Sequence, residues 1–413
     1  MDPDLPWAAA DAAREGDAPV LSTALQNARQ RTLDLLAACE QALGPALRVP
    51  FSVQLNPPLW EAGHVGWFQD YWIARNRQRS LGNRADPDAP RAAGRLPEAD
   101  ALYNSSVVAQ PTRWQLPLPD LAATRRYLDE GLDETLTLLA QTAATAADLY
   151  FFRLALFHEQ MHAEAATYMA QALDIALPDS LPGALPTSAA PPEAPTLRLP
   201  GGAWPLGYRQ PGFAFDNELN AHLVDLPAFE IDAAAVSWQR YLPFIAAGGY
   251  DDARCWSAAG WRWREGQRMT SPRYLRQVDG AWQHCRFGQW RPLEFAAPAV
   301  HLSHFEADAW CRWAGRRLPN EAEWECAALA APHAHGFAWG EVWEWTASRF
   351  LPFPGFRAHP YRDYSAPWFD SRYVLRGASR GTAPEMAHPR YRNFFTPERN
   401  DIYSGFRSCA IDG

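Results

Sequence analysis

Two histidines, His158 and His162, stand four residues apart in the segment HEQMH. Residues at i and i+4 share one face of an α-helix, so both rings can bind one metal ion. The spacing also matches the zinc-protease signature H-E-x-x-H, in which the glutamate is the general base. The positions of further ligands in those proteases hold Ala165 and Tyr168 here, and the next glutamate after Glu164 lies in a proline-rich segment. The zinc-protease interpretation is therefore weak.

A third histidine is available earlier in the chain. His64 stands in the segment PPLWEAGHVGWF, near the start of a helical stretch. In a four-helix bundle, His64, His158 and His162 could form a site with open coordination positions, suited to Zn, Fe or Cu and open to substrate and O₂. The alternative is that His64 only caps or packs. Glu159 and Glu164 either face solvent or, as we expect for one of them, orient a histidine ring.

The first part of the chain must hold these histidines, and it is rich in Ala and Leu with helical periodicity. Helices are expected over four stretches: 20–44, 57–78, 120–145 and 147–176. The leucines of the third recur with the spacing of an amphipathic helix. Asp120 and Asp148 are expected to cap the third and fourth helices. Four helices of this length predict an α-helical bundle, and the long connection between the second and third is expected to be functional or ordered against a neighbour.

A proline-rich stretch separates this bundle from a region of different character. We place the bundle at 1–177, a linker at 178–195 and a second domain at 196–413. In the second domain, Gly and aromatic residues punctuate short segments, which predicts short strands and irregular loops. Helices are expected only near 303–315 and 320–329. The fold class expected for the whole chain is α+β.

The composition excludes several classes of function. Lys and Arg number 38 against 47 Asp and Glu, a formal net charge of −9, so binding to nucleic acid or to an anionic membrane surface is not expected. The sequence has no run of about 18 apolar residues and no signal-like N-terminus. The six cysteines form no C-x-x-C pair and are interpreted as free, mostly buried thiols of a cytoplasmic protein. The oligomeric state is left open.

Ordered motifs along nearly the whole chain resemble a known enzyme family. They are the stretch 57–72 with His64, the stretch 158–164, FDNE at 215–218, RLPNEAEWE at 317–325, VWEWTAS at 342–348, VLRG at 374–377 and RNFF at 392–395 through GFR at 405–407. They are similar to the ergothioneine-type sulfoxide synthases. In that family a DinB-like four-helix bundle precedes a domain that resembles the formylglycine-generating enzymes, with a C-type-lectin-like fold.

The resemblance implies a non-haem iron enzyme. Fe(II) would be held by His64, His158 and His162, and O₂ would be a co-substrate. The substrate would be hercynine (Nα,Nα,Nα-trimethylhistidine), whose imidazole binds the iron and gains a carbon–chalcogen bond at C2. Asn393 matches a family residue near hercynine. Met161 stands where relatives often carry a substrate-contacting glutamine.

Aromatic residues have a second use in such a site, since aromatic faces recognise a trimethylammonium group. Phe394, Phe395, Trp67 and Trp345 are candidates, each of which could instead be core. The family also uses a tyrosine near the iron as a proton donor. Tyr361, Tyr364 and Tyr403 are the catalytic candidates here, and the resemblance does not choose among them. The alternative is that the stretch 353–356 takes that place, which would leave no tyrosine there.

The departures from the family concern the chalcogen donor. Members that use γ-glutamylcysteine carry two arginines after a Leu-(Phe/Tyr)-Asn-Ser motif. Here Arg113 fits the first, but the second position falls near Leu116. An aspartate that holds the donor's ammonium in those members is replaced by Phe395, while Arg399 is retained. Unpaired charges of a zwitterionic dipeptide would cost several kcal/mol, so a neutral or singly charged donor fits better.

Polar residues of the loop after the bundle's second helix could serve such a donor. The side chains that could hydrogen-bond sugar hydroxyls are Asn104, Ser105, Ser106, Gln110 and Thr112, although the same run could be a solvated loop. Arg113 and Arg399 would bind other groups of the donor. The segments WIARN at 72–76 and YNSS at 103–106 look similar to the selenoneine synthase branch, which uses a selenosugar. We therefore expect a selenosugar as donor, ahead of cysteine or another thiol.

Two further classes of function are weighed against this one. Formylglycine-generating enzymes bind copper through a cysteine pair, and the corresponding segment 383–392 has no cysteine, so that activity is rejected. A non-catalytic small-molecule or metal-binding module would share the same folds, because fold alone does not give function. Loss of any of the three histidines would favour the module, but all three are present.

Overall fold

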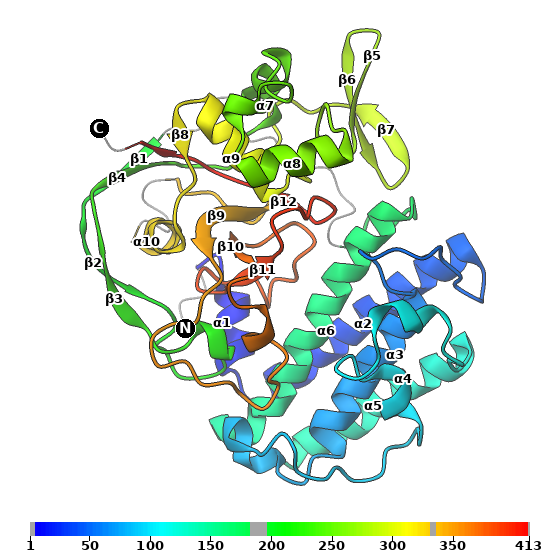
Figure 1. Ribbon diagram of the computed structural model, residues 1–413. Coiled ribbons are helices and arrows are strands. Elements are labelled where there is room, and N and C mark those ends of the chain that lie inside the picture. The colour runs from blue at the N-terminus through cyan, green and yellow to red at the C-terminus, as the bar shows by residue number, and fades with distance from the viewer. Residues whose placement is uncertain (1–4, 182–195, 331–335, 412–413) are drawn as a thin grey trace.

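The first part of the chain folds as a bundle of helices (Figure 1), as its periodicity predicts. The computed structural model describes residues 5–181, 196–330 and 336–411. Helices α2, α3, α5 and α6 pack against one another. The helices of this part are α1 (Ala8–Glu15), α2 (Ala18–Leu43), α3 (Pro58–Gln69), α4 (Ala99–Tyr103), α5 (Leu121–Ala140) and α6 (Ala146–Ala172). Short helical turns, including the π-helical segment Asp70–Ala74 that continues α3, order the long connection.

Local capping fixes where the bundle helices begin. The side chain of Asp120 accepts a hydrogen bond from the backbone N–H of Ala123 at 2.8 Å, which confirms the predicted cap of α5. The prediction that Asp148 caps α6 is wrong. Thr145, whose backbone is extended, accepts from the N–H of Asp148 at 3.1 Å, so the cap of α6 lies three residues earlier than expected. Asp148 instead lies in the first turn, where the helix dipole favours a negative charge.

Helix α6 lies between the bundle and the C-terminal part of the chain (Figure 1) and is buried along most of its length. Toward the bundle, Glu159 accepts a hydrogen bond from Arg29 of α2 at 2.8 Å. Toward the C-terminal part, Glu164 accepts one from the indole N–H of Trp343 at 2.7 Å. A helix that is largely apolar around its circumference must be covered on all sides, and α6 meets this requirement by contacting both parts.

The C-terminal part, residues 196–411, combines small sheets with short helices and long loops, as the α+β prediction requires. The sheets have the strand orders β1-β4-β13-β8, β11-β10-β9-β12, β5-β6-β7 and β2-β3. The helices are α7 (Trp238–Ala246), α8 (Ala258–Gln267), α9 (His304–Trp313) and α10 (Glu321–Ala330), the last two at the predicted places. The strands are β1 (Thr196–Leu199), β2 (Gly202–Leu206), β3 (His222–Leu226), β4 (Phe229–Asp232), β5 (Leu275–Val278), β6 (Ala281–Arg286), β7 (Gln289–Pro292), β8 (Arg316–Arg317), β9 (Trp343–Arg349), β10 (Tyr373–Gly377), β11 (Asn393–Phe395), β12 (Ser404–Gly405) and β13 (Cys409–Ala410).

Buried arginine–glutamate pairs hold this irregular part together. Arg376 pairs with Glu325 at 2.8 Å, where both side chains are fully buried. Arg14 of α1 pairs with Glu218 at 2.9 Å and so fixes the N-terminal helix to the C-terminal part. Removing one partner of such a pair leaves a buried, uncompensated charge, which costs about 3–5 kcal/mol.

Two further expectations bear on the chain as a whole. All six cysteines are free and buried, as the sequence predicts. No helix within the described ranges is both long enough and apolar enough to span a lipid bilayer. Most of the predicted linker, residues 182–195, lies outside the described residues.

A buried carboxyl group, that of Glu306, lies at the start of α9. It accepts hydrogen bonds from the Tyr250 hydroxyl at 2.6 Å and from the backbone N–H of Ser303 at 2.8 Å. Burial raises the pKa of Glu306 from 4.5 to about 7, and these hydrogen bonds reduce the shift without cancelling it. The folded protein therefore favours the protonated carboxyl, and its stabilising effect is lost as the pH rises from 4.5 through 7.

We predict that Glu306→Gln removes this pH dependence, because glutamine resembles the protonated carboxyl. Between pH 5 and pH 8, wild type should lose about 2–3 kcal/mol of unfolding free energy relative to the variant. Urea denaturation followed by tryptophan fluorescence at both pH values measures the difference. Glu265→Gln on the exposed face of α8 is the control. Identical pH profiles for wild type and Glu306→Gln would contradict the prediction.

Candidate metal centre

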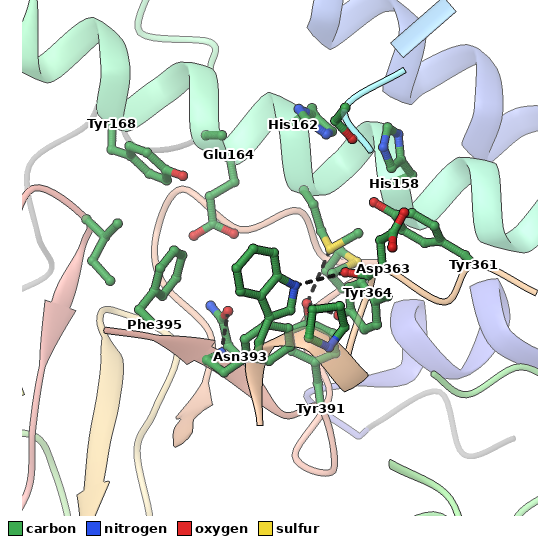
Figure 2. Close-up of a pocket in the computed structure, with 18 of the residues that line it drawn as sticks. His158, His162, Glu164, Tyr168, Tyr361, Asp363, Tyr364, Tyr391, Asn393 and Phe395 are labelled. Atoms are coloured by element: carbon green, nitrogen blue, oxygen red, sulfur yellow. Dashed lines mark hydrogen bonds between the residues drawn. The ribbon is translucent and has the colours of Figure 1, made fainter. Parts of the chain in front are cut away.

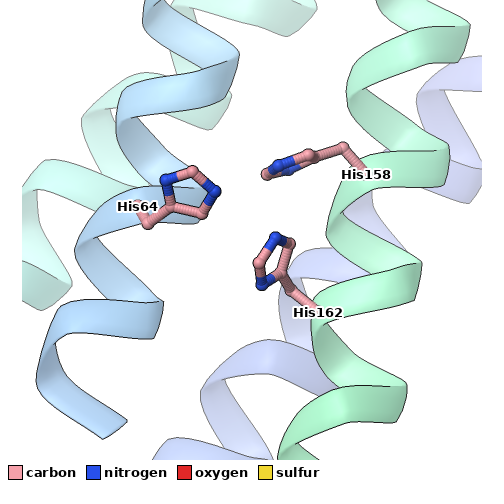
Figure 3. Close-up of side chains that lie close together, drawn as sticks. All are labelled: His64, His158 and His162. Carbon is pink, nitrogen blue, oxygen red and sulfur yellow. The ribbon is translucent and has the colours of Figure 1, made fainter. Parts of the chain in front are cut away.

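Three histidines from two helices converge on one point (Figure 3). His64 comes from α3, and His158 and His162 come from successive turns of α6. One ring nitrogen of each lies within 4.8 Å of the others. The helical i, i+4 spacing brings two of the rings together, and the packing of α3 against α6 supplies the third.

The outer nitrogens of two rings are fixed by neighbours. His64 Nδ1 lies 2.7 Å from the carbonyl oxygen of Tyr103, and His162 Nδ1 lies 2.5 Å from a carboxylate oxygen of Glu61. These contacts place the hydrogen of each ring on Nδ1, which leaves Nε2 with a free lone pair. The His64 ring is also stacked on the Trp60 ring, with centroids 4.8 Å apart.

The third ring is fixed by stacking. The rings of His158 and Phe68 lie parallel with centroids 3.5 Å apart. His158 Nε2 is buried and has no hydrogen-bond partner among the described residues. A buried nitrogen without a partner is costly, and a metal ion bound between the three rings would satisfy it. The donor set of three imidazoles suits Fe, Zn or Cu.

The electrostatics of the site also favour metal binding. Burial lowers the pKa of His64 to about 3, and the neighbouring His162 acts in the same direction. Burial, His162 and His64 hold the pKa of His158 well below its usual value. Both rings are therefore neutral at physiological pH, which is the form that binds a metal.

Glu61 is the carboxylate that orients a histidine ring, which corrects the expectation that Glu159 or Glu164 does so. Burial raises the pKa of Glu61, but His162, His64 and the side chain of Asn56 outweigh that effect and lower it to about 2. Glu159 faces away, toward Arg29. The glutamate lies on α3, one turn before His64, and sequence spacing along α6 alone gives no signal for it.

A pocket of about 550 Å³ opens beside the histidines (Figure 2). His158 and His162 form part of its wall, together with other residues of α6, residues of strands β9 and β11, and the loops around Ser105 and Tyr361. Eight of the candidate residues line it: Ser105, Ser106, Arg113, Tyr361, Tyr364, Asn393, Phe394 and Phe395.

Several of the candidate residues are not brought to the pocket wall. Asn104 uses its side chain to accept from the backbone N–H of Ser106 at 3.0 Å and so shapes the loop. Arg399 pairs with Asp401 at 2.5 Å and lies behind Phe395. Tyr403 lines a different cavity, because the chain turns its neighbour Ile402 toward the metal pocket instead.

The pocket also contains residues that the sequence analysis did not single out as site residues. Trp343 of β9 lines it, while the expected Trp67 and Trp345 do not. Glu164 presents its carboxylate there, held by Trp343, Ser379 and Thr382. Further lining residues are Tyr168, Asp363, Trp368 and Tyr391. Several lie in loops, where periodicity carries no information.

Comparisons with known proteins match both parts of the chain. Residues 24–170 match the DinB superfamily, and residues 182–341 and 334–412 match the sulfatase-modifying factor enzyme 1-like domain. A formylglycine-generating enzyme of Streptomyces coelicolor is 35% identical, but the match covers 58% of this chain and 96% of that protein. Such a match leaves the bundle and its histidines unaccounted for.

Other relatives match nearly from end to end. A hercynine oxygenase of Mycolicibacterium smegmatis is 31% identical over 94% of this chain and 97% of its own length. One from Mycobacterium tuberculosis is likewise 31% identical, over 94% of this chain and 97% of its own length. The chain belongs to the hercynine oxygenase family. The resemblance to the ergothioneine-type sulfoxide synthases is thus confirmed, as is the fold of a DinB-like bundle followed by a sulfatase-modifying-factor-like domain.

The geometry of this member of the hercynine oxygenase family predicts how Glu61 affects metal affinity. Glu61→Gln removes the charge that orients His162 and should weaken Fe(II) binding about 10- to 100-fold. Anaerobic titration against a competing chelator measures the affinity. Glu40→Gln, in a half-exposed ion pair with Arg125, is the matched control and should bind as wild type does. A Glu61→Gln affinity within twofold of wild type would contradict the assigned role.

Proposed function

We propose that this protein is an O₂-dependent non-haem iron enzyme that forms a carbon–selenium bond between a selenosugar and C2 of the hercynine imidazole. His64, His158 and His162 would hold Fe(II). When bound, the iron would supply the activation of O₂ next to the substrate imidazole. The single observation that carries the proposal is the pocket that opens on His158 and His162 in a member of the hercynine oxygenase family.

The inner end of the pocket fits hercynine. Aromatic faces and a nearby negative charge favour a trimethylammonium group, and the wall offers Phe395, Tyr168 and the carboxylate of Glu164 (Figure 2). Trp343 also lines the pocket. Asn393 accepts from the backbone N–H of Phe394 at 2.9 Å through its side-chain oxygen, so its NH₂ group remains to donate to the substrate.

The outer end of the pocket suits a hydroxyl-rich donor. Ser106 donates to Asp363 there, and Ser105 lies beside them. Trp368 is 38% exposed and offers a flat apolar face of the kind on which a sugar ring can stack. Arg113 is stacked at 3.8 Å over Trp60, with its Nε buried and without a partner among the described residues.

Tyr361 is the tyrosine best placed to move a proton. Its ring lies 6.1 Å from that of His158 between centroids, and it lines the pocket. Burial raises the pKa of Tyr361, so the phenol keeps its proton at neutral pH and can donate it. Tyr364, by contrast, has its hydroxyl 2.9 Å from that of Tyr391.

Parallel assays of donors test the proposal. The protein is loaded anaerobically with Fe(II), mixed with hercynine and one donor (a selenosugar, a thiosugar, cysteine or γ-glutamylcysteine), and exposed to O₂. We expect mass spectrometry to show the selenium product from the selenosugar. Product from cysteine or the dipeptide alone would reject the selenosugar, and no O₂-dependent product from any donor would reject the enzyme in favour of a binding module.

An ergothioneine-type enzyme that uses cysteine is the second candidate, and Asp363 favours it. A carboxylate at the outer end of the pocket could pair with the ammonium of cysteine, while Arg113 could pair with its carboxylate. The Leu116 side chain packs against the core, which leaves no second arginine for a dipeptide. Cysteine is therefore a better alternative donor than γ-glutamylcysteine.

We predict that Asp363→Asn separates these two donors. With a selenosugar, the amide still accepts a hydrogen bond, so KM should rise less than about tenfold. With cysteine, loss of the charge pair should raise KM about tenfold or more. Steady-state kinetics with both donors measures the contrast, and Asp86→Asn in a loop outside the pocket is the control. Equal effects on both donors would contradict the assignment.

We predict that Tyr361→Phe lowers kcat about 100-fold, because positioned proton donors contribute about 10²–10⁴-fold. Binding of Fe(II) and hercynine should change little, since the ring is retained. Tyr364→Phe is the matched control and should affect kcat less, as its hydroxyl is engaged with Tyr391. Rapid-mixing kinetics and anaerobic hercynine titration measure the two effects. Unchanged turnover in Tyr361→Phe would remove the tyrosine from the mechanism.

A further inference from the structure

A second polar cavity lies in the C-terminal part, apart from the metal pocket. It has a volume of about 90 Å³ and is enclosed by β6, β7, the segment 293–301, Arg380 and Tyr403. Gln171 at the end of α6 closes one side, where its side chain accepts from the backbone N–H of Phe287 at 2.8 Å. None of the residues assigned to the metal or to hercynine lines this cavity.

The hairpin β6–β7 brings cationic and imidazole side chains to one face. His284 and Arg286 are two residues apart on β6, so both point to the same side of the strand. His284 is the direct antiparallel partner of Arg291 on β7, and partners across such a pair also share a face. All three side chains line the cavity, and Arg380 approaches from the facing loop.

The charge of the cavity wall is strongly positive. Arg286, Arg291 and Arg380 line it, and the carboxylate among the lining residues is that of Glu294, whose charge acts on Arg286 and Arg380 and offsets part of theirs. Burial lowers the pKa of Arg286 to about 10, and Arg380 acts in the same direction. Guanidinium groups gathered in this way favour an anion between them.

The floor of the cavity adds neutral hydrogen-bonding groups. His301 Nδ1, His284 Nε2 and the Tyr403 hydroxyl are buried and have no hydrogen-bond partner within the described parts of the chain. Burial holds the pKa of His301 well below its usual value, with His284 and Arg273 acting in the same direction. Buried polar groups of this kind are normally paired, so their convergence on one cavity indicates a polar occupant.

The backbone at the floor is strained. His301 has φ of +62°, in the left-handed region that non-glycine residues seldom adopt. That conformation holds the imidazole in the cavity, 6.0 Å from the ring of His284 and 5.2 Å from that of Tyr403 between centroids. Strain of this kind persists where the surrounding structure requires a particular side-chain position.

We propose that this cavity binds a small tetrahedral oxyanion of the phosphate class. Arg286, Arg291 and Arg380 pair with its charge, and Tyr403 and Nε2 of His284 donate to its oxygens. His301 already bonds the backbone of Ile402 through its other ring nitrogen, so its Nδ1 accepts from a protonated oxygen of the ion. The volume admits one such ion, and the exposed rim at Arg291 and Glu294 leaves room for a substituent on it. A free phosphate ion and a phosphate monoester share this chemistry.

The site borders the metal pocket through two shared walls. Ile402 lines the metal pocket and its neighbour Tyr403 lines the anion cavity. Ser379 and Thr382 hold the carboxylate of Glu164, while Arg380 between them faces the anion. An oxyanion on Arg380 would therefore stabilise the loop that fixes Glu164.

Isothermal titration calorimetry of the intact protein with inorganic phosphate tests the proposal, with ionic strength held constant by chloride. We expect saturable one-to-one binding that Arg380→Gln and Arg291→Gln each weaken about tenfold. Arg291 lies at the exposed rim, so its variant is expected to fold even if the Arg380 variant does not. Arg276→Gln on β5, whose guanidinium stacks on Trp290, is the matched control and should bind as wild type.

A parallel titration with glycerol 3-phosphate distinguishes the two sources. Binding of both ligands supports an open mouth that accepts a monoester, and binding of phosphate alone supports a site for the free ion. The proposal is overturned if neither ligand binds saturably, or if Arg276→Gln weakens binding as much as Arg291→Gln does. Circular dichroism of each variant confirms that its fold is retained.

Discussion

Helix α6 must be covered on nearly every side, and the rest of the molecule is arranged around that constraint. Its sequence is too apolar for a surface helix, so the bundle covers one face and the C-terminal part covers the other. The three histidines of the candidate metal centre lie where these two faces meet. A site at this position can combine rigid helical ligands with a substrate wall built from loops, and neither part could form it alone.

The polar residues of α6 show how the constraint is met. Glu159 is neutralised by Arg29 on the bundle side, and Glu164 is held by an indole and two hydroxyls on the other. A buried carboxylate without such partners would cost several kcal/mol, so the Glu164 contacts favour the docking of the C-terminal part on α6. Burial raises the pKa of Glu164, while its hydrogen bonds and the charge of Arg31 act in the opposite direction.

The sequence predicts the four long bundle helices, α9, α10 and the three histidines, because helical periodicity and i, i+4 spacing are local signals, but it misses the shorter helices α1, α7 and α8. The i, i+4 spacing alone predicts that His158 and His162 share a helix face. Adding His64 to the same site requires the further hypothesis that its helix packs in the same bundle. Glu61 could not be assigned to His162, since that contact depends on how α3 docks against α6. The sequence also gives no signal that Ile402 lines the metal pocket while its neighbour Tyr403 lines a different cavity. The reason is that a loop without regular structure sets the direction of each side chain.

The residues that would bind the metal and those that would bind the donor are carried by different kinds of structure in this fold. The histidines are carried by helices that are packed on both sides, whereas the residues at the outer end of the pocket, Ser105, Ser106, Asp363 and Trp368, lie in connecting segments. Connecting segments tolerate substitution far better than packed helices do. A family with this architecture can therefore keep its metal chemistry while the donor changes.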